Sequence, residues 1–278
     1  MYILVCPCII NPSLRAKGIT SDEDRRIFSL CLERCESFGI ETVTLPCPET
    51  EFLGMGREPT NFTESLDNAE FSEILNRREN DVREVIRKRG PPLFILGVDS
   101  SPSCGVTMTY YSDVKIPGRG AFLSRFQDIP AIDVKEFAEY KVYLAAPLFS
   151  QSEREFNLRV AKILRDNFYD VFVPQEHGDD EDERCDNRTE VIFKRNLSAL
   201  EDSDIVVAVI DGADADSGTA WEMGYAYGKG RKIISLRTDF RSVGNKEFVN
   251  LMLEESSVVA SSPEEIPALI TPGFRLNL

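Results

Sequence analysis

The sequence has no long apolar run, only one histidine and no excess of positive charge. None of its hydrophobic segments approaches the length of a membrane-spanning helix, so we expect no membrane segment. The 278 residues carry a net charge of −15 without a basic stripe, which argues against a nucleic acid polymer as partner. The single histidine, His177, precedes an acidic stretch, residues 178–186, and we expect both at the surface. The apolar start of the chain lacks a basic region and a cleavage site, so we interpret it as a strand rather than a signal peptide.

Cysteines are numerous but unevenly placed. There are seven, an odd number, and no export signal accompanies them, which predicts a reducing, cytoplasmic location. Six of the seven lie in the first half of the chain. This asymmetry predicts two functionally different halves.

Strands and helices alternate in the first half. Apolar runs predict strands at 2–5, 42–45 and 93–97, and amphipathic periodicity predicts helices at 21–38 and 68–88. Ser21 and Asp24 form a capping pattern, and Gly39 is a natural end for the first helix. We therefore expect a smaller α/β domain with a parallel sheet over residues 1–126. Residues 127–140 contain Pro130 and no strong pattern, and we interpret them as a linker.

The alternation restarts in the second half, over residues 141–278. It predicts a Rossmann-like or flavodoxin-like parallel sheet flanked by helices. The expected strands are 141–145, 171–173, 204–210, 232–236 and 257–259, and the expected helices are 151–167, 189–201, 218–228 and 249–253.

An acidic, glycine-containing loop follows the buried strand at 204–210. The segment DGADADSGTAWEMG, residues 211–224, leads from that strand into a helix and places Glu222 in its first turn. Ligands of open α/β folds bind outside the carboxyl ends of the strands. A carboxylate at this position among small residues is a candidate nucleophile, although the helix dipole alone also favours an acid there.

Several motifs of the second half resemble the nucleoside 2-deoxyribosyltransferase family. They are the strand VYLAAPLF at 142–149, the segment DSGTAWEMG at 216–224, RTD at 237–239 and NLM at 250–252. The resemblance implies that Glu222 attacks or stabilises the anomeric carbon of a nucleoside or nucleotide, that Tyr143 orients it, and that no cofactor is needed. It also implies substrate contacts from Asp216, Asn196, Asn250 and Met252, the last two lent to a neighbouring subunit of a homo-oligomer. Backbone N–H groups at the start of the helix, near Gly218, can hold a hydroxyl or phosphate of the substrate.

One position departs from this family. An Asp is usual where Asn196 stands, and an amide cannot take up a proton as a carboxylate can. The change bears on base selection and on transfer to a second base, whereas simple glycosidic cleavage depends on Glu222.

Three cysteines of the first half follow predicted strands. Cys8, Cys47 and Cys104 are expected in loops at the same edge of a parallel sheet, so their thiolates can converge. Three converging thiolates suit an iron–sulfur cluster with one open iron, or zinc with an exchangeable fourth ligand. Their spacing alone does not distinguish the two.

Further motifs of the first half resemble the thiouracil desulfurase-like family. They are CPE at 47–49, REP at 57–59, SPSCG at 101–105 and GRGAF at 118–122. The resemblance implies a [4Fe-4S] cluster bound by Cys8, Cys47 and Cys104, with Cys8 matching better than Cys6. It also implies acid–base and substrate contacts from Glu49 and Ser101.

Together these patterns predict an enzyme acting on the N-glycosidic bond of a nucleoside or nucleotide. Two alternatives remain: an iron–sulfur-dependent desulfurase of thiolated nucleobases, and a nucleotide-sensing protein without turnover. Both resemblances concern nucleobases, which favours a joint role in processing modified nucleosides.

Overall fold

The computed structural model describes residues 1–177, 187–242 and 249–272, in two compact units. The N-terminal unit comprises Met1–Ala138, and the C-terminal unit begins at Glu139. The acidic stretch expected as a surface loop, 178–186, lies outside the described residues. Both units are α/β, so the predicted fold class is confirmed.

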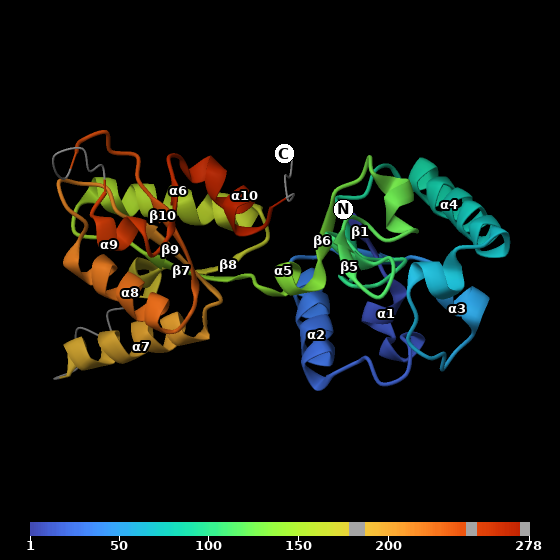
Figure 1. The fold of residues 1–278 in the computed structure, drawn as a ribbon. Coiled ribbons are helices and arrows are strands. Elements are labelled where there is room, and N and C mark those ends of the chain that lie inside the picture. The colour runs from blue at the N-terminus through green and yellow to red at the C-terminus, as the bar shows by residue number, and fades with distance from the viewer. Residues whose placement is uncertain (178–186, 243–248, 273–278) are drawn as a thin grey trace. The chain divides into compact units, whose positions relative to one another are not determined.

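A four-stranded parallel sheet forms the centre of the N-terminal unit, in the order β2-β1-β3-β6 (Figure 1). All four residues of β1 are buried, as expected for a parallel strand covered on both faces. Chain order reverses between β1 and β3, which makes their carboxyl ends the topological switch point, where ligands of such sheets bind. The strands are β1 (Tyr2–Val5), β2 (Glu41–Thr44), β3 (Ile95–Gly97) and β6 (Ala131–Asp133).

The long helices of this unit begin and end at capping residues. Ser21 and Asp24 form the predicted capping box of α2, and Gly39 follows that helix at a positive φ of 63°. Asn68 caps α4, and basic residues in its last turn interact favourably with the negative end of the helix dipole. The helices are α1 (Pro7–Ile10), α2 (Asp22–Ser37), α3 (Pro48–Leu53), α4 (Ala69–Arg89) and α5 (Val134–Ala138).

The N-terminal unit also contains structure that the sequence patterns did not predict. Cys8 lies in the one-turn helix α1 rather than in a loop, because Pro7 starts a helical turn directly after β1. A hairpin of β4 (Met108–Tyr110) and β5 (Lys115–Pro117) follows Cys104. Most of the expected linker is regular: β6 is the edge strand of the first sheet and α5 packs against it, because Ile132, Val134 and Phe137 are apolar and buried. The boundary between the units lies at Ala138 and Glu139.

A five-stranded parallel sheet forms the centre of the C-terminal unit, in the order β11-β10-β9-β7-β8. Numbered within the unit, this is the flavodoxin-like order 2-1-3-4-5, with its switch point between β7 and β9. Tyr143 lies on β7, and the acidic loop follows β9, so the predicted site is at this switch point. The strands are β7 (Lys141–Ala145), β8 (Asp170–Phe172), β9 (Ile205–Val209), β10 (Lys232–Leu236) and β11 (Val258–Ala260).

Helices cover both faces of the second sheet: α6 and α10 lie on one face, and α7 and α8 on the other (Figure 1). Ser150 and Glu153 form a capping box at the start of α6. The helices are α6 (Gln151–Asp166), α7 (Arg188–Asp202), α8 (Ser217–Gly228), α9 (Leu251–Glu254) and α10 (Ile266–Ile270). Over the residues that the structure describes, no helix has the length and apolar character of a bilayer span.

Candidate active sites

Glu222 and Tyr143 meet at the switch point of the C-terminal sheet. The Tyr143 hydroxyl donates a hydrogen bond to Glu222 Oε1 over 2.5 Å. The Tyr143 ring is fully buried and stacks on Phe172, with ring centroids 5.5 Å apart. His177 is exposed, as predicted, and also stacks on Phe172, with ring centroids 4.3 Å apart. The stack fixes the phenol, so Glu222 meets a donor of defined position.

The electrostatics of this pair distinguish Glu222 from a surface carboxylate. Burial raises the pKa of Glu222 to about 7, the Tyr143 hydrogen bond lowers it, and the nearby charge of Asp216 raises it. Burial also raises the pKa of Tyr143, and the Glu222 charge adds to that increase. Tyr143 is therefore a fixed neutral donor, and Glu222 changes its charge near neutral pH.

Asp216 and Gly218 shape the start of α8. Asp216 is the N-cap residue, and its Oδ2 accepts a hydrogen bond from Thr219 N over 3.0 Å. A Cβ at Gly218 would lie 3.0 Å from that same oxygen, so a larger residue would crowd the cap. Asp216 thus caps the helix, and it lies close enough to Glu222 for its charge to raise the pKa of Glu222.

Asn196 lies on α7, which packs against β7 and α8. Its side-chain oxygen is buried and accepts no hydrogen bond from any residue within the described ranges. A buried acceptor without a donor costs about 1–3 kcal/mol.

Asn250 and Met252 lie on the other flank of α8. Asn250 caps α9 by accepting a hydrogen bond from Met252 N, and the Met252 side chain is 71% exposed. Both line a cavity of about 530 Å³ beside Ser217, Ala220 and Gly224. Among the described residues, the lining of this cavity includes neither Glu222 nor Tyr143. Within one chain, the structure does not bring Asn250 and Met252 to the Glu222 pair.

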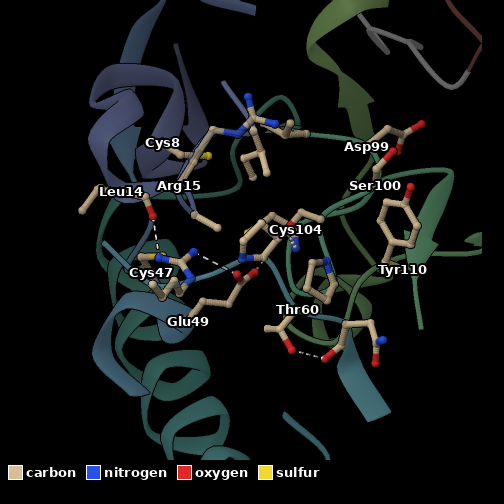
Figure 2. A pocket seen from close by; sticks show the side chains of 18 of the residues that line it. Cys8, Leu14, Arg15, Cys47, Glu49, Thr60, Asp99, Ser100, Cys104 and Tyr110 are labelled. Atoms are coloured by element: carbon tan, nitrogen blue, oxygen red, sulfur yellow. Dashed lines mark hydrogen bonds and ion pairs between the residues drawn. The ribbon is translucent and has the colours of Figure 1, made fainter. Parts of the chain in front are cut away.

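The three candidate cysteines of the N-terminal unit line one cavity of about 490 Å³ (Figure 2). Cys8 lies in α1, Cys47 is the N-cap residue of α3, and Cys104 is in the loop after β3. Figure 2 shows Cys8, Cys47 and Glu49 on the side of the cavity opposite Tyr110. The parallel sheet places these segments at the same edge, as the sequence predicted.

The thiols of this cavity influence one another. Burial raises the pKa of Cys8, and the neighbouring Cys104 and Cys47 add to that increase. A hydrogen bond with Cys6 and burial raise the pKa of Cys104. Cys47 Sγ instead accepts a hydrogen bond from Thr50 N over 3.4 Å, with the Thr50 hydroxyl 3.1 Å away. The cavity thus collects negative charge whenever its thiols ionise, and a bound cation would offset it.

The side chains that could hold a metal group in this cavity are thiols. Thiolates are ligands of iron–sulfur clusters and of zinc, so the donor chemistry fits both. Across residues 1–177, 187–242 and 249–272, no three Cys, His, Asp or Glu side chains are grouped as a single metal ion requires.

Glu49 and Ser101 line the same cavity, and they contact each other. Ser101 Oγ donates to Glu49 Oε1 over 3.2 Å and accepts from Cys104 N over 3.0 Å. The other Glu49 oxygen binds Arg57, which was not among the predicted site residues. Arg57 belongs to the REP motif, which was noted in the sequence. The motif did not indicate that the Arg57 side chain is buried.

A glycine lets the Cys104 loop pack closely. A Cβ at Gly120 would lie 2.5 Å from the Ser103 carbonyl carbon and 2.8 Å from Cys104 N. Only glycine leaves room for this backbone contact. The GRGAF segment therefore supports the cysteine loop by close approach.

Comparison with known proteins finds one matching family model and several solved structures that are similar to part of this chain. No curated protein matches the chain. A conserved protein from Enterococcus faecalis V583 is 28% identical, with 47% of this chain and 96% of that chain covered and a TM-score of 0.42. A 2-deoxyribosyltransferase from Bacillus psychrosaccharolyticus is 25% identical, with 46% of this chain and 90% of that chain covered and a TM-score of 0.40. A [4Fe-4S]-dependent thiouracil desulfidase is 20% identical, with 49% of this chain and 91% of that chain covered and a TM-score of 0.33.

Both families that the sequence resembles are represented among these structures. The family model for nucleoside 2-deoxyribosyltransferase covers residues 142–258, which include the Tyr143–Glu222 pair and the NLM motif. Residues 142–258 thus match the nucleoside 2-deoxyribosyltransferase family, as the motifs around Tyr143 and Glu222 predicted.

Proposed function

We propose that the C-terminal unit cleaves the N-glycosidic bond of a nucleoside or nucleotide, with Glu222 as nucleophile. The observation that carries this proposal is the 2.5 Å hydrogen bond from buried Tyr143 to Glu222 at the switch point. The family match over residues 142–258 supports the reaction class. No cofactor is required, because the reaction uses only a carboxylate and proton transfers.

The reaction follows from the charges of the site. The Glu222 carboxylate attacks the anomeric carbon, the C–N bond breaks, and its electron pair leaves with the base, which takes up a proton. Water or a second base then attacks the glycosyl ester and restores the carboxylate. We assign assistance in that proton transfer to Asp216, whose charge raises the pKa of Glu222. The Asn196 amide can only accept or donate a hydrogen bond.

The direct test is incubation with deoxyribo- and ribonucleosides, with and without a 5′-phosphate, in the presence and absence of a second free base. We expect chromatography to show release of the base, and exchange of the base if transfer occurs. A protein that binds nucleosides in calorimetry without consuming any of them would instead be the nucleotide-sensing alternative. Absence of both binding and turnover would contradict the whole proposal.

Asn250 and Met252 are proposed to complete the site of a second copy of the chain. In one chain they line a cavity on the other flank of α8, and Met252 is largely exposed. A homo-oligomer that brings the NLM segment of one copy to Glu222 of another accounts for both facts. Mixing Glu222→Gln and Asn250→Ala chains tests this, because a mixed oligomer regains activity only if the two residues act across copies.

The pH dependence of glycosidic cleavage is expected to report Glu222. The nucleophile must be ionised, so kcat/KM rises with pH and levels off above about 7. Tyr143→Phe removes a hydrogen bond that lowers the pKa of Glu222, so its profile shifts to higher pH. Its maximal rate is expected to fall by roughly 10–100-fold. Tyr169→Phe is the matched control, because Tyr169 is also fully buried and bonded, to Thr271. Identical midpoints for both variants would rule out this role for Tyr143.

For the N-terminal unit a second function is favoured by one observation: Cys8, Cys47, Cys104, Glu49 and Ser101 line the same cavity. We infer that the three thiolates hold a [4Fe-4S] cluster and that the unit removes sulfur from thiolated nucleobases. The cluster would supply an open iron that binds sulfur. In this proposal Glu49 moves a proton and Ser101 holds the ligand, and the hydrogen bond between them supports a shared site. Anaerobic purification, iron analysis and sulfide release from thiouracil test this inference, and a colourless protein after reconstitution would exclude it.

A further inference from the structure

One buried arginine contacts several walls of the cysteine-lined cavity. The Arg57 side chain is only 8% exposed. Its Nη1 donates to the Leu14 carbonyl over 2.7 Å and to Thr50 Oγ1 over 3.1 Å, and its Nη2 donates to Glu49 Oε2 over 2.9 Å. Leu14 ends the short helical turn that follows α1, the helix of Cys8. The guanidinium thus joins the Cys8 segment to the first turn of α3.

These contacts continue to the other two cysteines. The Thr50 hydroxyl lies 3.1 Å from Cys47 Sγ. The second oxygen of Glu49 accepts from Ser101, whose Oγ in turn accepts the backbone N–H of Cys104. One guanidinium therefore connects the three cysteine-bearing segments, which are far apart in the sequence, through at most two intermediate side chains.

Stability alone does not account for this arrangement. Arg57 Nε is buried and makes no hydrogen bond with any described residue, which costs about 1–3 kcal/mol. Desolvation of the Arg57–Glu49 pair adds a further cost, and buried ion pairs are often no better for stability than apolar side chains. Buried polar groups kept at such cost are characteristic of sites that need a fixed geometry.

We propose that Arg57 is a positioning residue of the N-terminal site, which fixes the Glu49 carboxylate and holds the Cys8, Cys47 and Cys104 segments in register. The proposal rests on the desulfurase function inferred above for its catalytic consequence. The planar fork of arginine makes several directed hydrogen bonds at once, whereas a lysine ammonium is a point charge on a flexible stem. Lysine at this position keeps the charge and loses the geometry.

The test compares Arg57→Lys with the wild type as anaerobically reconstituted full-length protein. We expect kcat for sulfide release to fall at least tenfold, with KM within about threefold, because orientation rather than binding is lost. Iron-free protein supplies a second measurement: iodoacetamide alkylation of Cys47, followed by peptide mass spectrometry, is expected to be several-fold faster in the variant. Arg78→Lys is the matched control. Arg78 pairs with Glu51, which lies on α3 as Glu49 does, but the Arg78 side chain is 32% exposed. This control should change neither measurement.

The outcomes separate the proposal from the function on which it depends. If the wild type binds no iron and releases no sulfide, the desulfurase function fails, and the alkylation rates still decide whether Arg57 holds the Cys47 segment. If Arg57→Lys does not fold, Thr50→Val takes its place, since it removes the hydroxyl that connects Arg57, Cys47 and the Leu14 carbonyl and leaves the charge of Arg57. Unchanged kcat and unchanged alkylation in the folded variant would overturn the proposal.

Discussion

Replacing Glu222 by glutamine is expected to lower the rate of N-glycosidic cleavage by roughly 10³-fold or more, because an amide cannot form the glycosyl ester. The amide keeps the size of the side chain and can still accept the Tyr143 hydrogen bond, so the fold should survive. Chromatography of nucleoside and free base under identical conditions measures the effect.

Glu222→Gln is expected to have a higher free energy of unfolding than the wild type at high pH. The pKa of Glu222 rises from 4.5 to about 7 on folding, so the native state binds more protons than the unfolded state between those values. The free energy of unfolding of the wild type therefore falls as pH rises through that range, by up to about 3 kcal/mol. The free energy of unfolding of Glu222→Gln does not fall in this way, because its amide does not titrate. Urea unfolding should find the variant more stable near pH 8, with the difference vanishing near pH 4.

Glu201→Gln provides the matched control. Glu201 also accepts a hydrogen bond from a tyrosine of α8, Tyr225, but this pair lies at the protein surface. We expect the control to keep both its activity and the pH dependence of its stability. Equal activity of Glu222→Gln and Glu201→Gln would show that Glu222 is not the nucleophile.

Substitution of any one of Cys8, Cys47 or Cys104 by alanine is expected to abolish iron retention and sulfide release. Each thiolate would supply one of only three protein ligands, and two do not hold a cluster against loss. Iron and sulfide analysis, with the visible absorbance of anaerobically reconstituted protein, provides the measurement.

Two other cysteines are controls for this series. Cys35 is buried in α2 and does not line the cavity, so Cys35→Ala should bind iron normally. Cys6 is hydrogen-bonded with Cys104 but is likewise absent from the described lining, so Cys6→Ala should retain the iron while Cys8→Ala loses it. Iron loss in Cys6→Ala and retention in Cys8→Ala would reverse the ligand assignment.

The sequence predicted the elements with strong apolar patterns. Strands β1, β7 and β9 and helices α2 and α8 lie within a residue or two of their expected ranges, because parallel strands buried on both faces leave continuous apolar runs. The convergence of the three cysteines followed from the same topology. Placement of Glu222 beside Tyr143 came from the family resemblance and is matched by the hydrogen bond between them.

The one-turn helices and the polar network were beyond these patterns. Helices α1 and α3 are too short for periodicity, although both begin with a Cys-Pro pair whose proline stands at the first helical position. Arg57 reaches Leu14, 43 positions away, and nothing in an arginine's local sequence indicates which carbonyl it will bind. Likewise, β6 and α5 are short and are stabilised by contacts with β3 and α2, far away in the sequence, so residues 131–138 resembled a linker.

The division at Ala138 and Glu139 leaves each sheet complete within its own unit. One round of translation therefore delivers one copy of each unit, and gene expression cannot alter their ratio. For the two chemistries proposed above, an imbalance would then be set by turnover numbers and by the supply of iron, rather than by enzyme abundance.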